Sequence, residues 1–222
     1  AYEDMIGMHL SRVQPVLLRG KAEDGFSIPA GVLEKEVVEQ GIDAFVLSNP
    51  CNPTGQVVSG QELDDYVRIS RDHGCSLILD EFYSHFIYTD DGQPGDGPVS
   101  AAAHVDDVNR DPVVVIDGMT KSFRYPGWRV GWAVGPADMI EILNRVGSSV
   151  DGGPCQPMQQ RAVIKVLEPA RADQETTALR VAFARKRNLT VERLADMGIK
   201  CAQEPQATFY AWATVEDLPP PL

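Results

Sequence analysis

One lysine of this sequence lies in a segment whose composition predicts a loop rather than a helix surface. The segment GMTKSFRYPGWRVGW, residues 118–132, places Lys121 shortly after an apolar run and among glycine, proline and two tryptophans. A primary amine that apolar groups shield from water loses part of its preference for the charged form, so its pKa falls. We expect Phe123, Tyr125 and the two tryptophans to surround Lys121, and we expect the amine to act as a nucleophile or a base.

Two other stretches carry polar side chains directly after buried apolar runs. SNPCNPTG contains two Asn-Pro pairs, and a cis bond at Asn52-Pro53 would hold the asparagine side chain rigidly. LILDEFY runs from an apolar run into Asp80 and then Tyr83. Asp80 alone would also fit the magnesium-binding acid of a nucleotide hydrolase, but the sequence has no intact GxxxxGK[ST] phosphate loop to accompany it.

The elements that must position these residues alternate between apolar runs and amphipathic segments. Continuous runs rich in β-branched residues predict buried strands over 44–50, 75–81, 112–117 and 129–135. Helical periodicity predicts helices over 28–41, 59–74, 136–147, 159–168 and 176–198.

Three finer expectations concern single elements. Val13–Leu18 is predicted to be an edge strand, since Pro15 cannot donate to a strand ladder. Ser59 and Glu62 have the spacing of a capping box at the start of their helix. Residues 207–215 are predicted to form a lone strand after the last helix.

Apolar strands separated by helices predict an α/β fold, a mostly parallel sheet covered by helices on both faces. Ligands of such sheets bind outside the carboxyl ends of the strands, so one crevice would collect all three polar stretches. The strands stop after about residue 156, and we expect a domain of residues 1–175 followed by the beginning of a smaller one, 176–222.

Composition narrows the classes of function. The net charge of −12, from 32 acidic and 20 basic residues, argues against binding to nucleic acid or to anionic membranes. No apolar run approaches the roughly 18 residues of a membrane-spanning helix. Four scattered cysteines form no CxxC pair, so we predict reduced thiols, a cytoplasmic location and no metal site. A start at alanine and an end at DLPPPL suggest a fragment of a longer protein.

The three stretches form a spaced pattern along the chain: Asn52-Pro53-Thr54-Gly55, Asp80-x-x-Tyr83, Lys121 and Arg129. Together with GWRVGW and FYAWATV, this pattern resembles the class I and II aminotransferases of pyridoxal-phosphate fold type I, which are similar to aspartate aminotransferase. The resemblance covers essentially the whole chain. It implies the large domain of that fold, with a seven-stranded type of sheet between helices, followed by the start of a small α+β domain.

The resemblance assigns pyridoxal 5′-phosphate as the cofactor, with Lys121 and Asp80 as its central contacts. Lys121 would form a Schiff base with the cofactor's aldehyde and later carry the proton from the substrate Cα. Asp80 would pair with the pyridine nitrogen and keep it protonated, so that the ring accepts electrons.

The remaining contacts implied by the resemblance surround the ring and its phosphate. Asn52 and Tyr83 would hydrogen-bond the ring's 3′ oxygen, and Arg129 would bind the phosphate with help from Thr120. The family's ring-stacking aromatic residue and its carboxylate-binding arginine correspond to positions outside this chain.

The resemblance implies an aminotransferase that moves an amino group from an amino acid to a 2-oxo acid, and a homodimer at full length. Two alternatives share the same core. One is a carbon–sulfur lyase or another enzyme that deprotonates Cα. The other is a non-catalytic cofactor-sensing domain of a transcription regulator.

Overall fold

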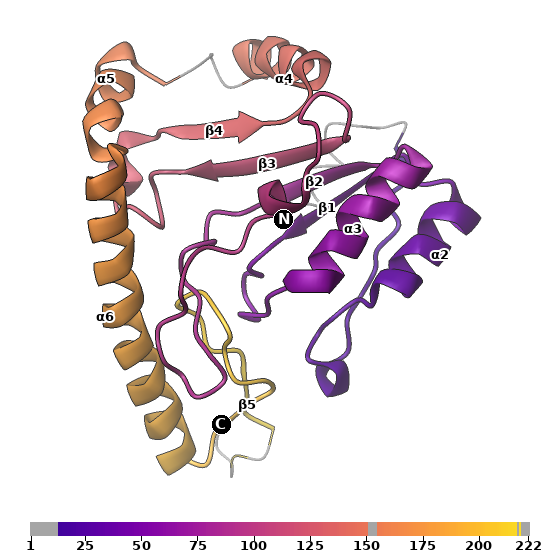
Figure 1. The fold of residues 1–222 in the computed structure, drawn as a ribbon. Helices are drawn as coiled ribbons and strands as arrows, with labels where there is room; N and C mark the ends of the chain where they lie inside the picture. Colours follow the sequence, from indigo (N-terminus) through magenta and orange to yellow (C-terminus); the bar gives the residue numbers. More distant parts are fainter. Residues whose placement is uncertain (1–12, 151–154, 217, 219–222) are drawn as a thin grey trace.

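A mostly parallel sheet of four strands organises the part of the chain that the structure describes. The computed structural model describes residues 13–150, 155–216 and 218 (Figure 1). The sheet has the order β1-β2-β3-β4, with β1 at Ala44–Ser48, β2 at Ser76–Asp80, β3 at Val113–Gly118 and β4 at Gly131–Val134. All four overlap the predicted segments, and the first three are parallel.

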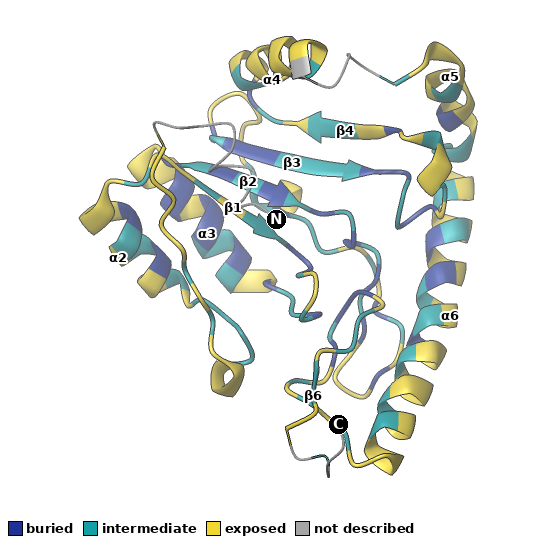
Figure 2. Cartoon of the chain, turned by 180° about the vertical axis from the view of Figure 1, so that it is seen from behind, coloured by how far each residue is buried: buried dark blue, intermediate teal, exposed yellow. Residues whose placement is uncertain are grey.

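β4 runs antiparallel to β3. In both views β3 points toward the long helix α6, Pro169–Asp196, and β4 points away from it (Figures 1 and 2). Parallel strands need a crossover connection, whereas residues 119–130 contain only the short 3-10 turn η3, Pro126–Trp128. The chain therefore turns back on itself at the carboxyl end of β3.

The main core lies between the sheet and two helices, α2 at Ala30–Gln40 and α3 at Gly60–His73. Leu63 and Val67 of α3 pack with Leu77 and Leu79 of β2, and all four are fully buried. Figure 2 shows the buried residues gathered along β2, β3 and the side of α3 next to them. Both helices end at a glycine in the left-handed conformation, as predicted.

The remaining elements follow the sheet or connect its parts. They are η1 at Ala22–Asp24, η2 at Ala101–His104, α4 at Ala137–Val150, α5 at Pro157–Val166, β5 at Lys200–Cys201 and β6 at Ala213–Thr214. In the described residues, no helix combines the length and hydropathy needed to cross a membrane.

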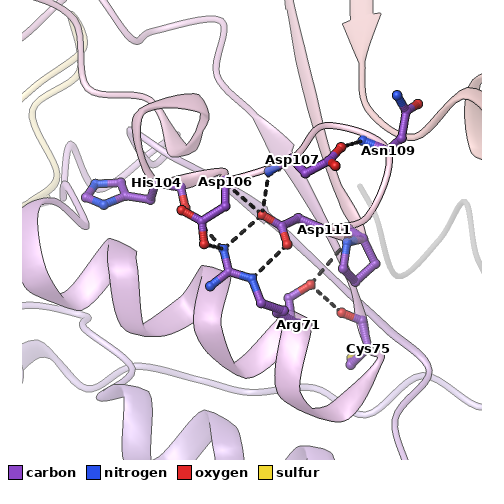
Figure 3. A network of polar contacts seen from close by, with 9 residues as sticks. Arg71, Cys75, His104, Asp106, Asp107, Asn109 and Asp111 are labelled. Atoms are coloured by element: carbon purple, nitrogen blue, oxygen red, sulfur yellow. Dashed lines mark hydrogen bonds and ion pairs between the residues drawn. The ribbon is translucent and has the colours of Figure 1, made fainter.

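An ion pair to a buried aspartate fixes the turn that leads into β3 (Figure 3). Arg71 of α3 donates to both oxygens of Asp111, at 2.7 and 2.8 Å, and also pairs with Asp106. Asp111 in turn accepts the backbone N–H groups of Asp106 and Asp107. The hydrogen bond from Arg71 is the main reason that the pKa of Asp111 falls to about 2. This network holds the start of β3, and so the strand that leads to Lys121, against α3.

Three of the finer sequence expectations are wrong. Val13–Leu18 forms no strand, because these mostly exposed residues pair with no neighbour in the described chain. Ser59 occupies the N-cap position of α3 without a side-chain cap bond, and Glu62 instead accepts from Ser27.

The third concerns residues 207–215, of which only Ala213–Thr214 is strand, paired antiparallel with β5. Residue 175, the predicted domain boundary, lies within the continuous helix α6. The division into two domains therefore stays a prediction.

Candidate active site

The three polar stretches leave the sheet at one edge. Ser48, Asp80 and Ile116 lie side by side at the carboxyl ends of β1, β2 and β3. The Asn49 N–H donates to the Asp80 carbonyl at 2.9 Å, and the Glu81 N–H donates to the Ile116 carbonyl at 2.8 Å. The parallel register thus produces the shared edge that the sequence predicts.

Lys121 lies in a closed loop, residues 119–130, which we call the lysine loop. Met119 and Val130 are joined by a backbone hydrogen bond of 2.9 Å at its base, and the Tyr125 N–H donates to the Met119 carbonyl at 2.9 Å. Met119, Phe123 and Val130 are buried in a cluster that also includes Val163 of α5. This packing restricts the backbone that carries Lys121.

Side chains of the lysine loop also connect it to its neighbours. Ser122 Oγ donates to the Phe82 carbonyl at 3.2 Å, in the segment that follows β2. Arg124 pairs with Glu175 of α6. The lysine loop is therefore held between the end of β2 and α6.

The rings over the lysine amine are Tyr83 and Phe209. Lys121 Nζ lies 5.6 Å from the centroid of the Tyr83 ring and 5.5 Å from that of Phe209. The tryptophans expected to surround Lys121 pack instead, with Tyr125, against the cluster at the base of the lysine loop. The two rings found against the amine are thus not among the residues that the sequence pattern suggested.

Tyr83 is buried, and its hydroxyl lies 2.6 Å from the hydroxyl of Tyr210. Burial is the main cause that raises the pKa of Tyr83, with further contributions from the hydrogen bond to Tyr210 and the charge of Asp80. The phenol is consequently a neutral hydrogen-bond donor at neutral pH.

Asp80 ends β2 beside two other acidic residues. Its Oδ1 accepts the Phe82 N–H at 3.3 Å. Burial raises the pKa of Glu81 to about 6 and that of Asp117 to about 7. Asp117 is not among the predicted site residues, although its place at the end of the apolar run VVVID is a signal of the same kind as that of Asp80.

The other predicted site residues lie in the segments that follow β1 and β3. Asn52 and Arg129 are exposed, Thr120 is half-buried, and in the described residues none of the three hydrogen-bonds Lys121. Arg129 Nη1 donates to the Pro126 carbonyl at 3.3 Å. Both the Asn49-Pro50 and Asn52-Pro53 bonds are cis, as the sequence suggested for the second.

Asn49, which the sequence analysis left without a role, fixes the segment that carries Asn52. Its buried amide donates to the Val58 carbonyl at 2.8 Å and accepts the Val58 N–H at 2.9 Å. These two bonds close residues 50–57 into a loop beside the end of β2.

Two hollows border α6. The larger, of about 550 Å³, lies between residues 92–94 and α6 and contains none of the predicted site residues. The smaller, of about 210 Å³, is lined by Phe209, Tyr210 and residues of α6. Of these two, the smaller hollow touches residues near Lys121.

Comparison with known families identifies the family to which this chain belongs. A model of the family described as aminotransferase class I and II matches residues 3–218. The chain belongs to this family. Class I and II aminotransferases are pyridoxal-phosphate-dependent enzymes that transfer amino groups, and pyridoxal phosphate is therefore the cofactor to test against the site.

The chain is also similar to relatives with several specificities. The chain is 28% identical to an aspartate aminotransferase of Streptomyces avermitilis over 92% of its own length and 48% of that protein. It is also 28% identical to an LL-diaminopimelate aminotransferase of Moorella thermoacetica, over 95% of its own length and 51% of that protein. The chain thus spans about half the length of the curated relatives it matches.

Solved structures agree on the fold. An aromatic aminotransferase of Pyrococcus horikoshii aligns with a TM-score of 0.74 and 28% identity, over 88% of this chain and 50% of that one. N-Succinyldiaminopimelate aminotransferase of Mycobacterium tuberculosis aligns with a TM-score of 0.76 and 25% identity, over 93% and 50%. The α/β fold with a mostly parallel sheet is that of the aspartate aminotransferase-like enzymes.

The chemistry of the side chains fits pyridoxal phosphate. Lys121 provides a primary amine for an aldehyde, Asp80 a carboxyl group for a pyridine nitrogen, and Tyr83 a neutral phenol for the ring oxygen. The guanidinium of Arg129 suits a phosphate, with Thr120 in the same loop.

Proposed function

We propose that this protein is an aminotransferase that uses pyridoxal phosphate to move an amino group from an amino acid to a 2-oxo acid. Membership of the family supports amino-group transfer in general. The observation that supports the role of Lys121 is the position of its side chain. Its amine lies over the buried Tyr83 ring, at the sheet edge where β2 ends in Asp80.

Lys121 has two tasks in this proposal. Its amine would hold the cofactor through the aldehyde group, and, once free, the amine would take up the proton that leaves the substrate Cα. Both tasks require a primary amine held in one place, which the packed and hydrogen-bonded base of the lysine loop provides. When bound, the cofactor supplies a ring that accepts the electron pair left at Cα.

The other residues hold and orient the cofactor. Asp80 would pair with the ring nitrogen, while Tyr83 and Asn52 would donate to the ring's 3′ oxygen. Arg129 and Thr120 would bind the phosphate.

A homodimer and a cytoplasmic location, both expected from the sequence, are parts of the same proposal. The division into a large and a small domain at about residue 175 also belongs to this proposal. Sedimentation of the protein at its natural length would test the dimer, and an active monomer would overturn it.

Covalent labelling tests the central claim. The protein at its natural length is incubated with pyridoxal phosphate, reduced with borohydride and digested, and the modified lysine is identified by mass spectrometry. We expect one adduct, on Lys121. Lys165→Ala, which removes an exposed lysine of α5, should leave the labelling unchanged. A folded protein without an adduct on Lys121 would refute the proposal.

Turnover then distinguishes transfer from lyase chemistry. An aminotransferase forms one oxo acid for each acceptor oxo acid consumed, whereas a carbon–sulfur lyase releases ammonia and pyruvate without an acceptor. We expect the first result, and Asp80→Ala should keep the fold but lose nearly all turnover. A regulator domain would bind the cofactor and show neither reaction.

A further inference from the structure

A segment near the end of the chain contributes two aromatic residues to the surroundings of Lys121. Residues 205–211, which we call the strap, cross from α6 to the sheet edge and bring Phe209 over the lysine amine and Tyr210 onto Tyr83. Tyr83 and Tyr210 are 127 positions apart in the sequence. No role follows for Tyr210 from the sequence pattern alone.

Backbone contacts hold the strap firmly enough to position a hydroxyl group. The N–H groups of Gln206 and Ala207 both donate to the Gly55 carbonyl, and the Thr208 N–H donates to the Phe86 carbonyl at 3.0 Å. Thr208 is buried and adopts a left-handed φ of 67°, and its Oγ1 accepts the Tyr210 N–H at 3.1 Å. These bonds fix the backbone from which the Tyr210 side chain extends.

The rings make a second set of contacts. The Tyr83 ring meets the rings of Phe209 and Tyr210 edge to face, with centroid separations of 5.4 and 5.6 Å. These contacts leave the hydroxyls of Tyr83 and Tyr210 facing each other across 2.6 Å. The contact between the two phenol groups therefore results from the packing of both side chains.

A phenol has one donor hydrogen and accepts through its oxygen. If Tyr210 donates to the Tyr83 oxygen, the Tyr83 hydrogen is directed to another acceptor. A hydroxyl that accepts one hydrogen bond is also a stronger donor in the next. Tyr83 would then present a polarised O–H group to the cofactor's ring oxygen.

We propose that Tyr210 is a positioning residue, which donates to the Tyr83 hydroxyl and thereby directs the Tyr83 hydrogen toward the cofactor. The proposal rests on the proposed function, since it requires that pyridoxal phosphate occupies the site beside Lys121. Tyr210 touches Tyr83 and acts through it.

Tyr210→Phe tests this role, because it removes the hydroxyl and keeps the ring. Two quantities are measured on the protein at its natural length. One is the dissociation constant of pyridoxal phosphate for the cofactor-free protein, from quenching of tryptophan fluorescence. The other is the pH midpoint of the visible absorption change of the bound cofactor, which responds to hydrogen bonds at the ring oxygen.

We expect the dissociation constant to rise about two- to tenfold, the range of one net hydrogen bond. The pH midpoint should also rise, because a weaker donor stabilises the ionised ring oxygen less. Tyr83→Phe should raise the midpoint further, and adding Tyr210→Phe to it should change nothing more. Tyr66→Phe, which removes a phenol that donates to the Ile28 carbonyl in the main core, should leave the midpoint unchanged.

The outcomes separate this inference from the proposed function. A Tyr210→Phe protein that is labelled on Lys121 and titrates at the wild-type midpoint would overturn the role of Tyr210 alone. Additive effects of Tyr210→Phe and Tyr83→Phe on the midpoint would overturn that role as well, because Tyr210 would then not act through Tyr83. If the wild-type protein is not labelled on Lys121, the proposed function fails first.

Discussion

Asp117 shows how one side chain at the site edge makes stability depend on pH. It lies at the end of β3, where its carboxyl accepts the Gly118 N–H at 2.6 Å and contacts Ser84. Burial is the main cause that raises its pKa to about 7, and the charges of Glu81 and Asp80 add to it. The carboxyl therefore keeps its proton to a much higher pH in the folded state than in the unfolded chain.

The sign of the effect follows from proton binding. Between the ordinary carboxyl pKa of about 3.8 and the folded pKa of about 7, the folded chain holds a proton that the unfolded chain has lost. The stability contributed by Asp117 is complete below this window and is lost as the pH rises through it. Asp117→Asn removes the ionisation and keeps an oxygen for the Gly118 N–H.

We therefore expect Asp117→Asn to be more stable than the wild type at pH 8, by on the order of 1–3 kcal/mol, with little difference near pH 4. Urea unfolding at several pH values measures this. A stability difference that is constant across the range would contradict the buried-carboxyl explanation.

At the scale of elements, the junction of β3 and the lysine loop depends on a close backbone approach at Gly118. A Cβ added there would lie 2.8 Å from the Val130 carbonyl oxygen and 2.9 Å from both Gly131 Cα and a ring carbon of Phe82. Two of these three contacts are backbone atoms, which cannot move aside independently. Pairing of β3 with β4 and the position of Lys121 therefore require glycine here.

Gly118→Ala should destabilise the protein by about 1–3 kcal/mol, the usual range for overpacking, and should slow cofactor binding at Lys121. The control is Gly147→Ala on α4, where an added Cβ meets nothing within 4 Å. That change should stabilise the helix by about 0.5–1 kcal/mol. Thermal melts of both variants give the comparison, and equal melting temperatures would refute the close-approach argument.

At the scale of the whole molecule, the strap joins the end of the chain to the sheet edge. Beyond its bonds to Gly55 and Phe86, the Gln206 carbonyl accepts the Tyr88 N–H, and Tyr88 Oη donates to the Thr208 carbonyl at 2.5 Å. Arg187 of α6 donates to the Pro205 carbonyl at 3.1 Å. Residues that the sequence places in a second domain are thus bonded directly to the first.

Tyr88→Phe should weaken this junction, because it leaves the buried Thr208 carbonyl without its donor. We expect the free energy of unfolding to fall by about 1–2 kcal/mol. Hydrogen exchange should become faster at the amides of residues 206–210, whereas the amides of α3 should exchange faster only by the amount that the lower global stability explains. Exchange that accelerates equally throughout the chain would show that the strap does not open separately.

The sequence by itself determined the strands and helices, and the edge of the sheet at which the three polar stretches lie. The four strands, the glycine ends of α2 and α3, and the shared edge of β2, which ends in Asp80, and β3, which leads to Lys121, follow from local periodicity and turn residues, which act over a few positions. Parallel pairing then brings the carboxyl ends of the strands together without further information.

Only the tertiary structure decided what surrounds those residues. The rings over Lys121 come from Tyr83 and from the strap, rather than from the neighbouring tryptophans. Val13–Leu18 finds no strand partner in the described chain, and the carboxyl of Asp117 is withdrawn from water by burial in the fold. These outcomes depend on contacts between residues far apart in the chain. Such contacts leave no periodic signal, because packing joins surfaces whose order along the sequence is unrelated to their distance in space.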